Sequence, residues 1–338
     1  MLRIGIAGIG FMGMIHYLAV QRAAGVQVVA IQSRDAKKRG GDWRGIHGNF
    51  GPPGAVMDLS GLQRYESLEQ LLADPLVDLV DLTVPTPQHE FLAIQALKAG
   101  KHVLVEKPIA LEVAAADRMI ATAKQSGRLL MVAHVLPCFP EFRFGLEVAK
   151  SQRYGKLLAG QFTRVIAQPN WSAAVADMNT TGGPAVDLHI HDTHFIRTMA
   201  GQPNEVIAVG YAVDGVVCHL TTLYRFADGP ALSCSSGALV GAARPFAHGF
   251  ELYFENATLS FGPGQPLTVI GSTKCETPPV TPDPVAAFTY ELERVAASVA
   301  AGVAEPFLAA ETARDALRMC LKEIESVVSR KAVSLTDH

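Results

Sequence analysis

The first stretch with a chemical signature is a glycine-rich turn near the start of the chain. Gly8-Ile9-Gly10-Phe11-Met12-Gly13 fits Gly-x-Gly-x-x-Gly and stands between an apolar segment and a helical pattern. There the first glycine allows a tight turn, the second lets a pyrophosphate approach the backbone, and the third lets helix and strand pack closely. The helix adds free N–H groups and a positive dipole end. The stretch predicts dinucleotide binding through Gly8, Gly10, Phe11, Met12 and Gly13; the alternative is a turn without a ligand.

The residues after the second expected strand bear on which dinucleotide binds. An acid there binds the ribose 2′-hydroxyl of NAD, whereas a nearby arginine accepts the 2′-phosphate of NADP. This chain has Gln32-Ser33-Arg34, and Asp35 comes only after the arginine. Ser33 can donate to a phosphate and Arg34 can bind one through two parallel hydrogen bonds. We expect NADP as the preferred cofactor and NAD as the alternative; a solvated basic helix start would explain the same residues.

A lysine follows another expected strand. Lys107 comes after an apolar run and before Pro108, which predicts a place at the carboxyl edge of a parallel sheet, where ligands bind. A partly desolvated lysine beside a nicotinamide cation has a lowered pKa. It can then hydrogen-bond a substrate oxygen and help its proton leave. A surface ion pair between Lys107 and Glu106 is the alternative explanation.

Asp187 and His191 are four residues apart in a helix that we expect from Pro184 to just before Gly201. At this spacing both side chains face the same way. Histidine, with a pKa of about 6.5, suits a general base, and the aspartate can orient it or bind a substrate hydroxyl. Two alternatives stay open: polar residues at a domain interface, or a zinc site that adds His194. We expect no metal.

These stretches need a sheet to position them, and the pattern of the chain changes partway along. The first third alternates short apolar runs with helical patterns, which is typical of a parallel sheet. From about residue 157, strand-like segments follow one another with short turns and indicate a mostly antiparallel sheet. Helices are expected at 284–300 and 308–329. The glycine-rich segment 40–61, which contains Arg44, is either functional or a surface insertion.

Composition excludes several classes of protein. The 338 residues predict about two domains. Lys and Arg number 29 against 32 Asp and Glu, which disfavours a nucleic-acid binder. We see no uncharged apolar stretch long enough for a membrane span and no signal peptide. The five cysteines are scattered, so we expect free thiols and a cytoplasmic protein.

Three further stretches resemble the Gfo/Idh/MocA family of oxidoreductases, which acts mostly on sugars, sugar derivatives and inositols. They are Val84-Pro85-Thr86-Pro87-Gln88-His89, Glu106-Lys107-Pro108 and the segment 182–192. The resemblance implies an α/β fold: a Rossmann domain, here 1–134, and an α/β domain with a large, mostly antiparallel open sheet, here 135–338. It also implies an active site between the domains and a homodimer or homotetramer built through the open sheet.

The resemblance further implies an NAD(P)-dependent dehydrogenase or reductase. A hydride would pass between the nicotinamide and a carbinol or carbonyl carbon of a sugar, sugar derivative or inositol. Lys107 and His191 would be catalytic, with Asp187 beside them. The expected cofactor residues beyond the glycine turn are Ser33, Arg34, Thr83, Val84, Pro85, Thr86, His89, Glu106 and Lys107. The expected substrate-binding residues are Lys107, His134, Trp171, Asp187 and His191. Two alternatives remain: an NAD-dependent glycoside hydrolase, and a non-catalytic cofactor-binding protein.

Overall fold

The computed structural model describes residues 1–167, 178–239, 241, 243–279 and 283–336. The chain packs into two compact units. The first unit comprises Met1–Cys138 and Asp283–Arg314, and the second comprises Phe139–Pro282 and Asp315–His338. The expected division after residue 134 lies close to the end of the first segment, but residues 283–314 pack with the first unit rather than with the second.

The first unit contains a six-stranded parallel sheet in the order β3-β2-β1-β4-β5-β6. The strands are β1 (Leu2–Ala7), β2 (Val26–Gln32), β3 (Gln63–Tyr65), β4 (Leu79–Leu82), β5 (His102–Glu106) and β6 (Leu130–Ala133). The strand order reverses between β1 and β4, where Ala7 pairs with Gln32 on one side and with Leu82 on the other. Ligands bind at this switch point in open parallel sheets, outside the carboxyl ends of the strands.

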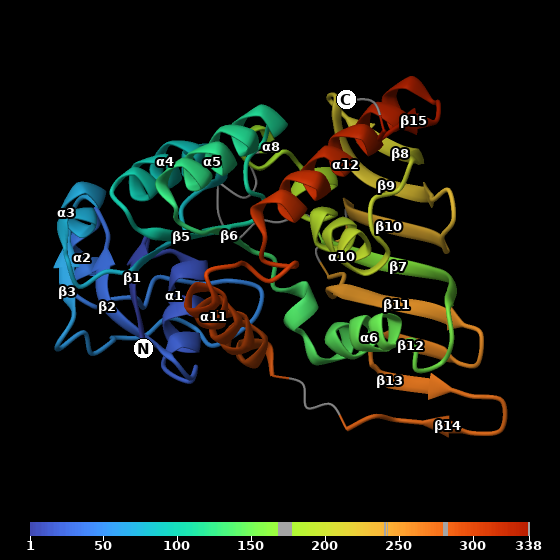
Figure 1. Ribbon diagram of the computed structural model, residues 1–338, viewed down its shortest axis with the longest axis horizontal. Helices are drawn as coiled ribbons and strands as arrows, with labels where there is room; N and C mark the ends of the chain where they lie inside the picture. The colour runs from blue at the N-terminus through green and yellow to red at the C-terminus, as the bar shows by residue number, and fades with distance from the viewer. Residues whose placement is uncertain (168–177, 240, 242, 280–282, 337–338) are drawn as a thin grey trace. The chain divides into compact units, whose positions relative to one another are not determined.

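Helices cover both faces of this sheet (Figure 1). They are α1 (Phe11–Val20), α2 (Ala36–Arg39), α3 (Leu68–Ala73), α4 (His89–Lys98), α5 (Val113–Ser126) and α11 (Pro284–Ala301), with the short 3-10 helices η1 (Thr86–Gln88) and η2 (Leu136–Cys138). Local sequence explains their ends: Ser67 and Gln70 form a capping box at α3, and Gly127 ends α5 in the left-handed region. The helices α4 and α5 lie side by side, as do α1 and α11.

The glycine-rich segment 40–61 packs against α1. Trp43 is fully buried and meets Tyr17 edge to face at a centroid distance of 5.0 Å. Phe50 lies edge to face with Phe11 at 4.9 Å and stacks on Phe288 of α11 at 5.6 Å. The segment is therefore fastened by aromatic side chains to the helix that follows the glycine turn, rather than lying loosely on the surface.

The second unit contains a nine-stranded sheet in the order β14-β13-β12-β11-β7-β10-β9-β8-β15. Its strands are β7 (Leu157–Ala167), β8 (Glu205–Val213), β9 (Val216–Arg225), β10 (Ala231–Leu239), β11 (Ala247–Phe254), β12 (Thr258–Gly262), β13 (Gln265–Ile270), β14 (Cys275–Glu276) and β15 (Val333–Ser334). Every neighbouring pair is antiparallel except β7 with β10. The expected α/β fold with a parallel sheet and a large, mostly antiparallel sheet is confirmed.

One face of the second sheet is covered by helices of the same unit (Figure 1). They are α6 (Pro140–Ser151), α8 (Met178–Thr181), α9 (Pro184–Asp187), α10 (Ile190–Ala200) and most of α12 (Ala310–Ser329). An aromatic core joins them to the strands, with Phe142 at 5.2 Å from Phe195 and at 5.1 Å from Phe250. No helix among the described residues is long and apolar enough to cross a membrane.

Candidate active site

The glycine turn connects β1 to α1 and leaves room for a ligand at one position. A Cβ atom on Gly8, which has φ +98°, would lie 2.9 Å from the carbonyl oxygen of Thr83. A Cβ on Gly13 would lie 2.2 Å from the carbonyl oxygen of Gly8. A Cβ on Gly10, at the N-cap of α1, would meet nothing within 4 Å. The first and third glycines are therefore required by the fold, and the second borders the open space that a pyrophosphate needs. These residues fit a bound dinucleotide.

The end of β4 holds the turn in place. The Thr83 hydroxyl is 2.6 Å from the carbonyl oxygen of Gly8, to which it donates. Val84 continues past it, partly exposed, and leads into Pro85 and Thr86 at the start of η1. Since the predicted cofactor residues from Thr83 to Thr86 and those of the turn belong to one hydrogen-bonded corner, the structure brings these two groups together.

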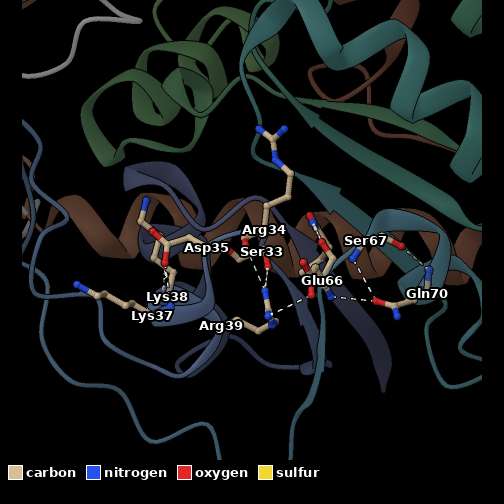
Figure 2. A network of polar contacts seen from close by, with 10 residues as sticks. Ser33, Arg34, Asp35, Lys37, Lys38, Arg39, Glu66, Ser67 and Gln70 are labelled. Atoms are coloured by element: carbon tan, nitrogen blue, oxygen red, sulfur yellow. Dashed lines mark hydrogen bonds and ion pairs between the residues drawn. The ribbon is translucent and has the colours of Figure 1, made fainter.

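Figure 2 shows the polar residues that follow β2. Asp35 accepts hydrogen bonds from the backbone N–H groups of Lys37 and Lys38 and so caps α2. Arg39 donates to the carbonyl of Ser33 at 2.7 Å and reaches Glu66 at 3.3 Å. The exposed side chain of Arg34 extends away from Arg39 (Figure 2). The acid nearest to the strand end is thus used as a helix cap, and an arginine is left facing solvent.

Lys107 follows β5, and its surroundings are set by buried residues. Its side chain is partly exposed, whereas Glu106 is 6% exposed. One oxygen of the Glu106 carboxylate accepts the backbone N–H of Lys107 at 3.1 Å. That carboxylate therefore supports the lysine backbone.

His89, at the start of α4, links the two loops that carry predicted cofactor residues. Its ring is fully buried, with Nδ1 2.9 Å from the carbonyl oxygen of Pro108 and Nε2 2.9 Å from that of Val84. Burial lowers the pKa of His89, and a neutral imidazole donates from one nitrogen at a time. The structure therefore places His89 between the loops after β4 and β5 as an internal brace.

In the second unit the predicted helix from Pro184 is interrupted. It forms α9, which ends at Asp187, and α10, which begins at Ile190. The N–H of His189 bonds the carbonyl of Pro184 at 3.0 Å, and that of Asp192 bonds the carbonyl of His189 at 3.1 Å. The expectation of one continuous helix is wrong, because these bonds span five and three residues and break the regular ladder.

Asp187 and His191 stand on either side of this break and are both partly exposed. The side chain of His189 turns inward, with Nε2 2.6 Å from Glu323 of α12 and Nδ1 2.8 Å from the Ser236 hydroxyl. Burial lowers the pKa of His189, and the Glu323 carboxylate opposes this effect. The pKa of His189 therefore lies well above its usual value. A buried imidazolium–carboxylate pair thus anchors the segment between the two candidate residues.

A second buried ion pair follows directly after His191. Arg164 of β7 is 4% exposed and donates to both oxygens of the fully buried Asp192, at 2.6 and 3.1 Å. His194 is also fully buried. Within the described ranges no group of three metal-ligating side chains gathers.

The remaining residues that the sequence singled out are less informative. His134 follows β6 directly, and its side chain is fully buried. Trp171 lies outside the described residues. Arg44, within the segment 40–61, donates to both carboxylate oxygens of Asp42 at 2.8 Å, which ties its guanidinium to its own loop.

Several buried ionisable residues were absent from the sequence-based candidates, among them His16 of α1, Asp81 of β4 and Glu291 of α11. The signal was present for one of them, because Asp81 interrupts the apolar run Leu79-Val80-Asp81-Leu82, and a charged residue in a buried strand needs a partner. The other two lie in helices whose sequence does not reveal which strand they face.

The fold and the glycine turn define an α/β protein with a dinucleotide-binding Rossmann domain. A model of the Gfo/Idh/MocA oxidoreductases, described as an oxidoreductase family with an NAD-binding Rossmann fold, matches residues 2–134. The first 134 residues of the chain therefore resemble the Rossmann domain of the Gfo/Idh/MocA family.

Among the proteins similar to the chain are two curated relatives and one solved structure. An uncharacterised oxidoreductase of Rhizobium meliloti is 33% identical over 55% of this chain and 52% of its own. The trans-1,2-dihydrobenzene-1,2-diol dehydrogenase of Oryctolagus cuniculus is 30% identical over 60% and 58%. The chain thus spans a little over half the length of these relatives. A levoglucosan dehydrogenase in complex with NADH and levoglucosan has the same fold, with a TM-score of 0.84 and 18% identity over 99% of this chain and 100% of that one.

The open space at Gly10 gives a test of the dinucleotide site. Gly10→Ala should fold normally, since its backbone at φ −104° is allowed for alanine, but should lower dinucleotide affinity about tenfold or more. Gly13→Ala should lower stability as well, because its Cβ has no room. Calorimetry and thermal unfolding separate the two effects. Equal affinity for the dinucleotide in Gly10→Ala and the unaltered protein would contradict this assignment.

Proposed function

We propose that this protein is an NAD(P)-dependent oxidoreductase acting on a CH–OH or carbonyl group of a sugar, sugar derivative or inositol. The observation that carries the proposal lies within the first unit: Lys107 follows β5 at the same carboxyl edge of the sheet as the glycine turn and Thr83. The similarity to a diol dehydrogenase and to a levoglucosan dehydrogenase supports this substrate class. The relatives described above are oxidoreductases, so the hydrolytic and non-catalytic alternatives gain no support.

The chemistry divides among three side chains. A bound nicotinamide supplies or accepts the hydride at its ring. Lys107 donates a hydrogen bond to the substrate oxygen and stabilises negative charge that develops there. His191 takes the hydroxyl proton during oxidation and returns it during reduction. Asp187 holds the geometry by orienting His191 or by binding a neighbouring hydroxyl.

We further propose that NADP is preferred. Arg34 is exposed beyond the end of β2, and Asp35 is occupied as the cap of α2. An exposed guanidinium can form two parallel hydrogen bonds to a 2′-phosphate, and Ser33 can add a third. NAD carries a hydroxyl in place of the 2′-phosphate and cannot form this charge-assisted pair with Arg34.

Arg34→Ala should therefore weaken NADPH binding by about one to two orders of magnitude and leave NADH binding nearly unchanged. Arg44→Ala is the matched control, because the Arg44 guanidinium is bound to Asp42. Calorimetric titration of NADPH and NADH into the unaltered protein, Arg34→Ala and Arg44→Ala measures these affinities. NADH binding more tightly than NADPH to the unaltered protein would overturn the proposed preference.

The substrate class is tested by turnover. The purified protein is assayed with NADP⁺ or NAD⁺ and a panel of sugars, anhydrosugars, inositols and cyclic diols, and in reverse with the corresponding ketones and NADPH or NADH. Absorbance of the reduced nicotinamide should change with at least one of these substrates. Tight binding of cofactor without turnover on any polyhydroxylated compound would contradict the proposed class.

We also propose that two or four copies of this chain assemble through the second sheet. Its strands expose large apolar side chains on one face, among them Val209 at 70%, Tyr211 at 62% and Leu223 at 53%. Such a patch marks an interaction surface. Light scattering should give the mass of a dimer or tetramer, and Leu223→Asp should lower it. Leu76→Asp, at a 49% exposed leucine of the first unit, is the control. A monomeric mass for the unaltered protein would contradict the proposal.

A further inference from the structure

Four ionisable side chains are buried together in the first unit. His16 comes from α1, Asp81 from β4, Glu106 from β5 and Glu291 from α11. Three of them are 0% exposed, and Glu106 is 6% exposed. A buried charge is costly unless it is paired, so the arrangement of these groups has to be specific.

His16 bridges two of the carboxylates. Its Nδ1 is 2.8 Å from Asp81 Oδ2, and its Nε2 is 3.1 Å from Glu106 Oε1. An imidazole donates from both nitrogens only when it is protonated. Burial lowers the pKa of His16. The carboxylates of Asp81 and Glu106 raise it by more than burial lowers it, so the pKa of His16 lies well above its ordinary value. His16 is therefore an imidazolium at neutral pH, held between two carboxylates.

The Glu106 carboxylate connects His16 to the backbone of Lys107. While its Oε1 faces His16, its Oε2 accepts the backbone N–H of Lys107 at 3.1 Å. A continuous path of hydrogen bonds and ion pairs thus runs from Asp81 through His16 and Glu106 to the backbone of the lysine. His16 lies three residues after Gly13, in the helix that the glycine turn begins.

We propose that His16 and Asp81 are positioning residues for Lys107, acting through the Glu106 carboxylate. Neither touches substrate; together they fix the carboxylate that fixes the backbone from which Lys107 extends. The inference deepens the proposed function and rests on it for the catalytic role of Lys107. It assigns to α1 a second task, which is to couple the dinucleotide turn to the lysine at the end of β5.

Glu291 is the fourth group facing His16, and it plays a different part. Burial raises the pKa of its carboxyl well above the ordinary range, and Glu106 and Asp81 add to this, while His16 opposes it. Among the described residues neither of its oxygens has a hydrogen-bond partner. The neutral form of Glu291 is therefore favoured, and the residue lies outside the path to Lys107, so Glu291→Gln should behave like the unaltered protein.

Asp81→Asn tests the path. The amide oxygen can still accept from Nδ1–H, but one of the two negative charges that keep His16 protonated is gone, and the pKa of His16 falls. At a pH above the lowered pKa of His16, the unprotonated Nε2 faces the Glu106 carboxylate oxygen without a proton between them. The Glu106 side chain then moves. We expect kcat to fall with rising pH, by up to about tenfold per pH unit above that pKa, and to recover at about pH 6, while KM changes little. A loss of kcat that is independent of pH would overturn the proposal and assign Asp81 a merely structural role.

A spectroscopic measurement separates this inference from the proposed function. In protein labelled with ¹⁵N-lysine, the Lys107 amide is identified by its absence in Lys107→Arg. Its chemical shift should stay constant between about pH 6 and about pH 9 in the unaltered protein and in Glu291→Gln, and should titrate in Asp81→Asn. An amide shift that does not respond to Asp81→Asn would overturn the inference. If no polyhydroxylated substrate is turned over, the proposed function fails, and this titration still decides the positioning.

One readout needs no variant, in case Asp81→Asn does not fold. With ¹⁵N-histidine labelling, the His16 ring nitrogens of the unaltered protein should both have imidazolium shifts at about pH 8. A neutral His16 ring at this pH would overturn the inference, because one of its two carboxylate contacts would then lack a proton.

Discussion

Lys107→Met is expected to lower kcat by about two to four orders of magnitude while dinucleotide affinity stays within about twofold. Methionine keeps the length and apolar stem of the side chain but cannot donate a hydrogen bond to the substrate oxygen. The Lys107 backbone, held by Glu106, is unaffected by the exchange. The loss should therefore fall on the chemical step.

The control is a lysine at the opposite end of the same strand. Lys101 precedes β5 and donates to the carbonyls of Asp74 and Val77, both at 2.8 Å. Lys101→Met should cost stability and leave kcat nearly unchanged. Steady-state kinetics with calorimetric cofactor titration measures both effects. His191→Asn should repeat the Lys107→Met pattern, and a parallel loss of cofactor affinity in either variant would count against these roles.

Asp192→Ala is expected to lower the free energy of unfolding by about 3–5 kcal/mol. It leaves the guanidinium of Arg164, which is 4% exposed, without its carboxylate partner in the interior. Burial and the positive charge of the same guanidinium lower the pKa of His248 to about 3, so this histidine is neutral at neutral pH and adds no second positive charge. Urea unfolding at neutral pH measures the loss.

Two further variants test whether the loss of stability comes from the unpaired buried charge. Glu205→Gln removes one partner of the solvent-accessible pair with Arg225 in the same unit and should cost at most about 1 kcal/mol. The double variant Arg164→Met, Asp192→Leu should be more stable than Asp192→Ala, because it removes both buried charges. A loss below about 1 kcal/mol in Asp192→Ala would show that water reaches this pair.

Much of the fold was predictable because it rests on local patterns. The glycine turn, the alternation of strands and helices and the later run of strands predicted both sheets. The helices α11 and α12 lie close to their expected ranges. The strand β3 and the paired strands β12 and β13 were missed. Such short strands exist because a neighbouring strand pairs with them, and a neighbour distant in sequence leaves no periodicity to detect.

Some features of the candidate site were likewise predictable from local sequence, and others were not. Lys107 follows a strand of a parallel sheet, and this alone predicts its place at the carboxyl edge. The break between α9 and α10 was not predictable, because it accompanies the burial of His189 against Glu323, more than a hundred residues away. Nor did the spacing of Asp187 and His191 show that buried ion pairs stand beside them.

The sequence by itself determined the order of the elements, the glycine turn, the residues at the strand ends and the family resemblance, since each depends on residues close together in the chain. Only the tertiary structure decided which buried charges pair. It joined His16 to Asp81 and Glu106, joined Arg164 to Asp192, packed residues 283–314 with the first unit, and fastened the segment 40–61 to α1. The physical reason is that a charge or an aromatic ring is stabilised by whatever lies beside it in space, and that neighbour is set by the packing of elements far apart in the sequence.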